Sequence, residues 1–322
     1  MALKELALVN ILRTPYYLFG WIAPSIVVGL VVLCASVRPA YAQELDPTSA
    51  SQTLAGGAAL QPSDPNPGAL TLSGGVDLLN QYMLRGVRQN STGVAIWPAA
   101  DLAIAAYAGN GRVKGVVINV GTWNSLHTGD TGTAGPTTEL WYESDFYTTL
   151  GLGFGKGVSF TTTYLAYVSP NNSFTTVKEL LFKLAVDDIA HLGRAAVKPY
   201  VIIARELDTA PGRGQLDNGA KPGTYLELGI SPGYVRPKAS LAVPVKVGLS
   251  LSNYYELAGT DKRFGFLSIA GVVTVPLGSS STFGAWNIHG GAEFQKLGDM
   301  TAFFNGNNRS QIIGSIGIGF SY

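Results

Sequence analysis

The feature that most constrains the fold of this chain is an alternation of apolar with small or polar residues. It is clearest in residues 312–322, where the even positions are Ile, Phe and Tyr apart from one Gly, and the odd positions are Ser and Gly apart from one Ile. Side chains that alternate with period two belong to a β-strand whose two faces meet different surroundings. The pattern therefore predicts strands with one apolar face.

Twelve segments of this kind follow one another after residue 69. They are residues 70–85, 93–107, 112–124, 138–152, 157–168, 175–187, 196–207, 223–234, 239–255, 263–276, 284–296 and 310–322. Their connections alternate between short turns, such as 153–157, and longer polar loops, such as 208–222 and 298–309. An even strand count with short periplasmic turns and longer external loops is typical of outer-membrane barrels. We predict an all-β fold, a transmembrane antiparallel β-barrel of about 12 strands located in the cell outer membrane.

The composition narrows the alternatives. Only 13% of the residues are charged, about half of the roughly 25% found in soluble domains. Beyond residue 40, no apolar stretch approaches the roughly 18 residues that a spanning helix needs. A soluble β-sandwich, which would bury the apolar faces in a core, remains the alternative fold. The balance of 22 Lys and Arg against 21 Asp and Glu provides no basic surface, so we expect no nucleic acid partner.

The first 68 residues differ from the rest. Basic residues, an apolar stretch over 16–37 and the small-x-small sequence Ala40-Tyr41-Ala42 are typical of a secretory signal peptide. We expect cleavage after Ala42, with a retained helical anchor as the alternative. Residues 43–68 are rich in Pro, Ser, Gly and Ala without a period, and predict a flexible periplasmic linker. The domain prediction is a signal peptide over 1–42, a linker over 43–68 and the barrel over 69–322.

The inward faces of the predicted strands are acidic. With the apolar faces assigned to lipid, the charged residues expected to line the lumen and bind a solute are Asp77, Arg85, Asp101, Glu139, Glu143, Asp145, Glu179, Lys183, Glu227, Lys246 and Glu293. Glu139, Glu143 and Asp145 share one parity and predict an acidic wall whose neutralisation reduces cation preference. This arrangement favours a passive channel or a solute-selective porin with a cation-preferring lumen that passes small solutes. The alternative is a non-conducting structural or surface-interaction barrel whose interior charges pair with one another.

Catalytic and metal-binding patterns are weak. The single cysteine, Cys34, lies in the leading apolar stretch, so we expect neither a disulfide nor a metal site, and no cofactor. An outer-membrane lipid hydrolase needs a Ser–His pair with an orienting third group. Ser125 and His127 are close in sequence, but we expect them on a flexible external loop. The sequence therefore predicts no enzyme and no catalytic residue, and a lipid-modifying enzyme is the least favoured function.

The expected partners follow from the barrel. They are outer-membrane lipid and lipopolysaccharide around its wall, and the barrel-assembly machinery. The chain ends on Phe320-Ser321-Tyr322, and this final strand with its terminal aromatic residue resembles the C-terminal assembly signal of Gram-negative outer-membrane proteins.

Residues 80–104, NQYMLRGVRQNSTGVAIWPAADLAI, carry a family resemblance. They resemble the first hairpin of the Gcw-type conserved hypothetical proteins, an uncharacterised family of Gram-negative outer-membrane barrels with the pattern S-x-Y-x-x-R-G-x-x-Q followed by a Pro and an aliphatic strand. The matching residues are Tyr82, Arg85, Gly86, Gln89, Pro98 and Asp101. The chain departs from the pattern at Asn80-Gln81, where Ser-Asp is usual, and at Ser169-Pro170, where Tyr-Pro is usual. The resemblance implies an outer-membrane barrel involved in solute uptake and brings no defined chemistry.

Overall fold

The computed structural model describes residues 68–322 except 91, 132–139, 208–220 and 278–283. The predicted signal peptide over 1–42 and the linker up to residue 67 lie outside these residues, as does Glu139 of the predicted lumen set. Within the described ranges, no helix has both the length and the apolar character needed to cross a membrane.

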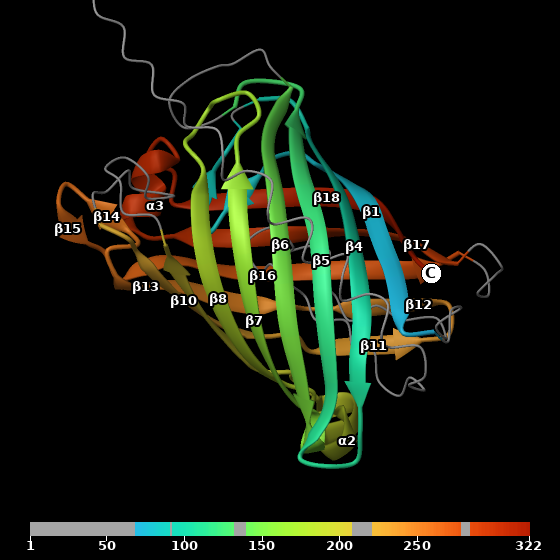
Figure 1. Ribbon diagram of the computed structural model, residues 1–322. Helices are drawn as coiled ribbons and strands as arrows, with labels where there is room; N and C mark the ends of the chain where they lie inside the picture. Colours follow the sequence, from blue (N-terminus) through green and yellow to red (C-terminus); the bar gives the residue numbers. More distant parts are fainter. Residues whose placement is uncertain (1–67, 91, 132–139, 208–220, 278–283) are drawn as a thin grey trace, which may run out of the picture. The chain divides into compact units, whose positions relative to one another are not determined.

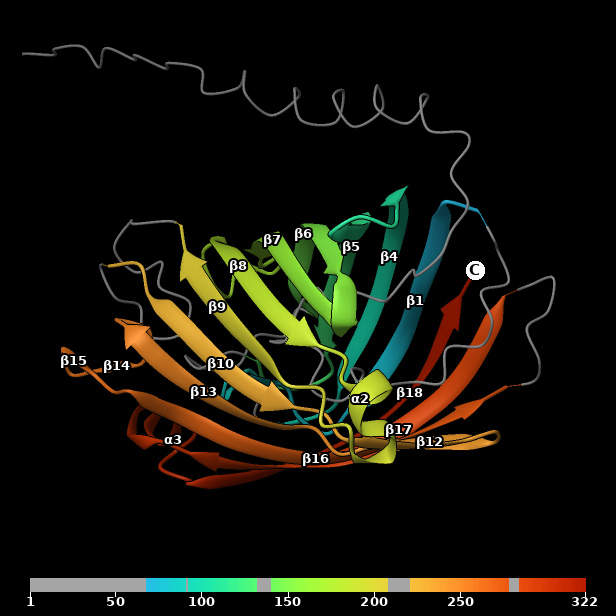
Figure 2. The same cartoon turned by 90° about the horizontal axis from the view of Figure 1, so that it is seen from below.

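The described chain forms a closed antiparallel β-barrel of twelve strands, as predicted (Figures 1 and 2). The barrel strands are β1 Leu70–Leu79, β4 Ala95–Ala108, β5 Val113–His127, β6 Trp141–Phe154, β7 Val158–Val168, β8 Val177–Val186, β9 Tyr200–Glu206, β10 Thr224–Ile230, β13 Val245–Ser252, β16 Phe264–Pro276, β17 Ala285–Leu297 and β18 Ser310–Ser321. Each strand pairs with its neighbours in this order. The ring closes where β1 pairs with β18, from Ser73 opposite Ser321 to Leu79 opposite Ser315.

Two of the predicted strands are each divided by a proline. The segment 223–234 consists of β10 and β11 (Gly233–Arg236), which are separated at Ser231-Pro232, and 239–255 begins as β12 (Ala239–Ala242) before Val243-Pro244 and β13. Proline lacks the N–H group that a strand interior needs for its ladder. The two interruptions lie side by side, because the Val243 N–H donates to the Pro232 carbonyl at 2.8 Å.

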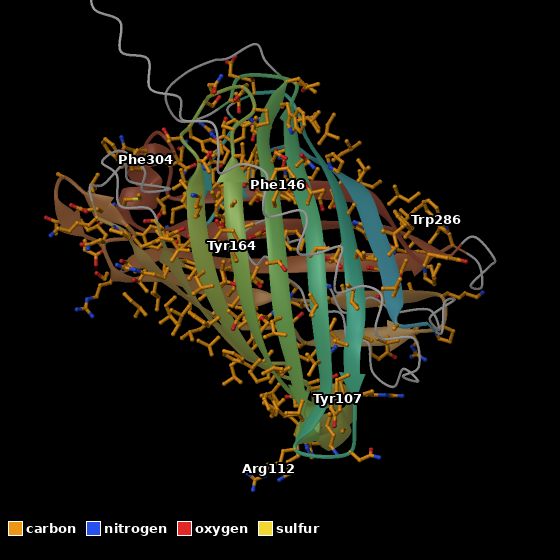
Figure 3. The ribbon with its side chains drawn as sticks, in the orientation of Figure 1. Tyr107, Arg112, Phe146, Tyr164, Trp286 and Phe304 are labelled. Atoms are coloured by element: carbon orange, nitrogen blue, oxygen red, sulfur yellow. The ribbon has the colours of Figure 1, made fainter. Side chains whose placement is uncertain are left out.

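The outer face of the barrel is apolar. Large apolar side chains alternate along the strands with buried or half-buried neighbours and are 37–57% exposed, among them Val76, Leu78, Phe146, Leu150, Phe182, Leu184, Leu228, Ile269, Val273, Phe294 and Ile316. Phe146 and Tyr164 lie on the wall formed by β6 and β7 in Figure 3. A closed barrel with this exterior is suited to lipid contact, whereas a soluble sandwich would bury these side chains.

Short and long connections lie on opposite rims. The short-turn rim carries the turns at 109–112 and 155–157 (η1, Gly155–Gly157) and the connection with α2 (Ile189–Leu192) and η2 (Gly193–Ala195). Tyr107 and Arg112 lie at this rim, distant from Phe304 on the other one (Figure 3). The long-loop rim carries the connection with β14 (Glu256–Leu257) and β15 (Thr260–Asp261) and the one with α3 (Asp299–Phe304).

The first long connection corrects the prediction for residues 80–85. We predicted that they continue the first strand, but β1 ends at Leu79 and residues 80–90 form a small hairpin of β2 (Met83–Leu84) and β3 (Val87–Arg88). Its two turn residues, Arg85 and Gly86, have φ values of +45° and +88°, which a tight two-residue hairpin turn requires. We call residues 80–90 the plug segment, because most of its side chains are buried inside the barrel.

Candidate functional site

The tip of the plug segment is bound to the barrel wall by a buried ion pair. Arg85 Nη1 lies 2.7 Å from Glu179 Oε1, and Arg85 Nη2 lies 2.9 Å from Glu179 Oε2. The two side chains are 1% and 0% exposed. Glu179 is on β8, and its Oε2 atom also accepts a hydrogen bond from the Tyr167 hydroxyl of β7 at 2.8 Å. A two-pronged pair of this kind fixes the position and the plane of the guanidinium group.

Tyrosines enclose the rest of the guanidinium. Arg85 Cζ lies 4.3 Å from the ring centroid of Tyr225 and 5.2 Å from that of Tyr254. Arg85 Nη1 also donates to the Tyr254 hydroxyl, and the Tyr255 hydroxyl donates to the Arg85 carbonyl at 2.9 Å. A cation over a desolvated tyrosine face is attracted by the ring quadrupole. We call Glu179, Tyr167, Tyr225 and Tyr254 together the guanidinium site.

A second buried carboxylate, that of Glu227, contacts Tyr225 of the guanidinium site. Glu227 on β10 is 0% exposed, and it accepts hydrogen bonds from the hydroxyls of Tyr225 at 2.6 Å and Tyr200 at 2.9 Å. Burial of a carboxylate is costly unless hydrogen bonds replace its hydration. The tyrosines of the lumen therefore have two roles, because they stack on the cation and donate to the acids.

Glu143 and Asp145 form a different kind of acidic site. They are 1% and 0% exposed, and neither Glu143 Oε1 nor the two Asp145 carboxylate oxygens have a hydrogen-bond partner among the described residues. A bulge precedes them on β6, since Ser125 is opposite Glu143 but Leu126 is opposite Trp141. The alternation that predicted the acidic wall is therefore interrupted, and the part of that wall that the structure describes consists of Glu143 and Asp145.

The remaining predicted lumen residues also occupy inward positions on their strands. Asp77 pairs with His289 at 2.7 Å, Asp101 accepts from the Asn119 amide at 2.8 Å, and Glu293 accepts from Ser268 at 2.5 Å and Gln295 at 2.8 Å. The ammonium groups of Lys183 and Lys246 lie over the rings of Tyr200 and Phe266. The structure thus gathers Arg85, Glu179 and Glu227 at the plug tip and distributes the other acids and lysines around the wall.

Contributors that the sequence analysis did not identify as parts of the site include Tyr167 and Asn305. Tyr167 alternates like its neighbours, and Asn305 belongs to a connection without a recognisable pattern. Asn305 is 0% exposed, its amide donates to the Gly86 carbonyl at 2.8 Å, and its Oδ1 atom accepts from the Arg88 N–H at 3.2 Å. Asn305 directly follows α3 and therefore joins this loop to the plug segment.

Ser125 and His127 are not on a flexible loop, which corrects the prediction. Both lie on β5 and are 0% and 3% exposed, with Ser125 Oγ 2.8 Å from His127 Nε2. The Trp97 indole donates to Ser125 Oγ at 3.0 Å, and His127 Nδ1 contacts Thr131 Oγ1. The His127 ring stacks on Tyr142 with centroids 4.5 Å apart. In this conformation the pair is inaccessible from solvent, and the Thr131 hydroxyl that His127 contacts lies 3.2 Å from the Gln89 carbonyl of the plug segment.

Comparisons with known proteins give similarity at the level of the fold. No family model and no curated protein matches the chain. An outer-membrane channel from Pseudomonas putida F1 is 13% identical, with a TM-score of 0.43 over 87% of this chain and 100% of that one. The NanC porin is 14% identical, with a TM-score of 0.40 over 78% of this chain and 99% of that one. The outer membrane phospholipase A from Escherichia coli is 9% identical, with a TM-score of 0.40 over 77% of this chain and 89% of that one.

Sequence identities and TM-scores this low indicate a similar fold and give no information about function. The strand pairings and the apolar exterior establish an outer-membrane β-barrel. The more specific resemblance to the Gcw-type family stays a prediction. Within the described ranges, no three His, Cys, Asp or Glu side chains are grouped so as to hold a metal ion. The distinguishing feature of the described barrel is the plug segment with its buried arginine.

Proposed function

We propose that this protein is a non-enzymatic outer-membrane channel for small cationic solutes, closed in the present conformation by the plug segment. The observation that carries the proposal is the buried pair of Arg85 and Glu179 at the tip of a segment that is not part of the barrel wall. The channel opens when this pair breaks and the plug segment leaves the lumen.

The wall is complete without the plug segment. Leu79, the last residue of β1, is directly opposite Ala95, the first residue of β4, so residues 80–94 lie beyond the paired part of the two strands. Residues 81–89 of the plug segment can therefore move without breaking the pairing of the barrel strands. A segment whose covalent connection to the wall is confined to its two ends, and whose tip is held by side-chain contacts, is suited to act as a gate.

Closure is supported by the burial of the polar residues around the plug. Glu143, Asp145, Glu179 and Glu227 face inward, and each is at most 1% exposed. Solvent does not reach them while the plug is in place, so a solute cannot pass at this level. The plug must move before the lumen conducts.

Cation preference is supported by the charges that remain when the plug leaves. Arg85 departs with the plug, and the wall keeps the four carboxylates of Glu143, Asp145, Glu179 and Glu227 against the two ammonium groups of Lys183 and Lys246. Carboxylates that line a narrow passage with low-dielectric walls attract cations and repel anions.

The proposal is tested by conductance in planar lipid bilayers under a salt gradient. Arg85→Ala removes one partner of a buried pair, which costs about 3–5 kcal/mol, and we expect a steady conductance with a cation-selective reversal potential. The unmodified protein is expected to conduct in rare, brief openings. Arg88→Ala, in the same segment but with a partly exposed side chain, is the matched control and is expected to behave like the unmodified protein.

The second candidate is a non-conducting structural barrel, which the close burial of the mid-lumen residues favours. A further variant distinguishes the two, with residues 81–89 replaced by a short Gly-Ser linker. Heat-modifiable migration on gels verifies that each variant is folded. Folded Arg85→Ala and linker variants that both remain silent would overturn the channel proposal and leave the structural barrel.

A further inference from the structure

We infer that the guanidinium site recognises the solute that the channel transports, and that this solute carries a guanidinium group. Arg85 occupies the site in the closed state as an internal substitute for the solute. The inference rests on the proposed function, because it names the class of solute that the proposed channel passes.

Every group of the guanidinium site belongs to the barrel or to another connection. Tyr167 is on β7, Glu179 on β8 and Tyr225 on β10, and Tyr254 follows β13 at the long-loop rim. None of them is in the plug segment. When the plug moves, these four groups are therefore not carried with it, and the site loses only its cation.

The geometry of the site matches a planar guanidinium group better than a spherical ammonium. The two carboxylate oxygens of Glu179 are contacted by the two different terminal nitrogens of Arg85, at 2.7 and 2.9 Å. The Tyr225 ring lies 4.3 Å from the central carbon. A lysine-like ammonium is a compact point charge that cannot bridge both oxygens in this way. The site therefore selects for planar, forked cations.

The contacts also indicate which part of the solute is recognised. The site binds both terminal nitrogens of Arg85, whereas its Nε atom has no hydrogen-bond partner among the described residues. Recognition is thus directed at the unsubstituted end of the group. A monosubstituted guanidinium fits with its terminal nitrogens on Glu179 and with its substituent leaving along the path of the Arg85 side chain.

The backbone of Arg85 supports the view that its side chain is placed there for this contact. Its φ of +45° is uncommon for any residue other than glycine. The Tyr255 hydroxyl binds the Arg85 carbonyl at 2.9 Å and fixes the turn from the other side. The hairpin turn requires a positive φ at this position, where Asn, Asp or Gly is usual, and Arg occupies it where its guanidinium reaches Glu179.

The test uses chemical complementation of the full-length Arg85→Ala protein in detergent. Methylguanidinium chloride at millimolar concentration is compared with methylammonium chloride and with neutral methylurea, and the readout is the midpoint of thermal unfolding. We expect methylguanidinium alone to raise the midpoint of Arg85→Ala by several degrees. It should leave the unmodified protein, whose site is filled, and the double variant Arg85→Ala/Glu179→Gln unchanged. If Arg85→Ala folds poorly, the same solutes are compared by the folded yield after refolding in their presence.

Equal effects of methylammonium or methylurea, or no effect of methylguanidinium, would overturn the inference. Its failure can be told apart from that of the proposed function because the unfolding readout does not require conduction. If Arg85→Ala conducts but methylguanidinium neither stabilises it nor blocks its current, only the guanidinium specificity is wrong. If methylguanidinium stabilises a variant that never conducts, the site exists but the channel proposal fails.

Discussion

Asp77 and His289 lie 2.7 Å apart, carboxylate to imidazole, although their strands β1 and β17 are not neighbours. The strand between them is β18, and Gly317 of that strand is opposite both residues. The two side chains meet over this glycine. A Cβ atom added at Gly317 would lie 2.2 Å from Asp77 Oδ1 and 2.6 Å from His289 Nε2. The pair therefore depends on the absence of a side chain at one position of the last barrel strand.

We expect Gly317→Ala to destabilise the barrel. The added methyl group forces Asp77 and His289 apart, and overpacking of this kind costs about 1–3 kcal/mol. Urea unfolding in detergent measures the free energy of unfolding. Gly314→Ala on the same strand is the control, because a Cβ atom there meets nothing within 4 Å. Equal stability of the two variants would show that the Asp77–His289 contact contributes nothing.

We expect Glu143→Gln with Asp145→Asn to reduce cation selectivity, measured in the conducting Arg85→Ala background. These carboxylates face inward and stay on the wall when the plug leaves, so they are placed to act on passing ions. The effect should decrease at about 1 M salt, where the Debye screening length is only roughly 3 Å. Asp299→Asn, which removes an exposed partner of Arg309 at the long-loop rim, is the control. An unchanged reversal potential in the double variant would show that other residues determine the ion selectivity.

We expect Asn305→Ala to increase the frequency of channel openings. The change leaves the Gly86 carbonyl and the Arg88 N–H without their partner, and an unsatisfied buried polar group costs about 1–3 kcal/mol. The plug then leaves the lumen more often, although Arg85 and Glu179 are intact. Open probability in planar bilayers is the measurement. Asn308→Ala, an exposed position in the same connection, should change nothing.

We expect Asp188 at the short-turn rim to make stability depend on acid pH. The backbone amide of Lys198, followed by that of Val197, donates to its carboxylate and holds its pKa below the usual value. A lowered folded-state pKa gives stability that is present above the unfolded value of about 3.9 and is lost as pH falls through the folded value. Asp188→Asn should therefore weaken the protein at pH 7 and much less at pH 2. A constant difference in unfolding free energy between these pH values would contradict this assignment.

The barrel could be predicted from the sequence because the alternation of side chains is itself the consequence of a wall between lipid and lumen. The same alternation identified Asp77, Glu179, Glu227 and Glu293 as inward residues, since each is directly followed by a large apolar residue. Proline divisions at Pro232 and Pro244 changed strand lengths without changing the strand order.

The plug segment could not be predicted because residues 80–85 follow β1 without a proline or glycine to mark the end of the strand. The turn that separates them from the wall uses Arg85 at positive φ, whereas hairpin turns are usually recognised by Asn-Gly or Asp-Gly. The bulge before Glu143 is equally hidden, because one extra residue in a strand leaves no mark in composition. The partners of Arg85 are distant in sequence, and local patterns do not report such contacts.

These distances in sequence also impose an order on assembly. Arg85 is followed by its partners Glu179, Tyr254 and Tyr255 only 94, 169 and 170 residues later, and Gly86 by Asn305 219 residues later. Neighbouring strands can pair as soon as each hairpin is complete, whereas contacts of such long range form late because the intervening chain must first be ordered. The interior of the nascent barrel therefore stays hydrated until its last loops are in place. The groups around Arg85 are then shielded from water only in the final step of folding.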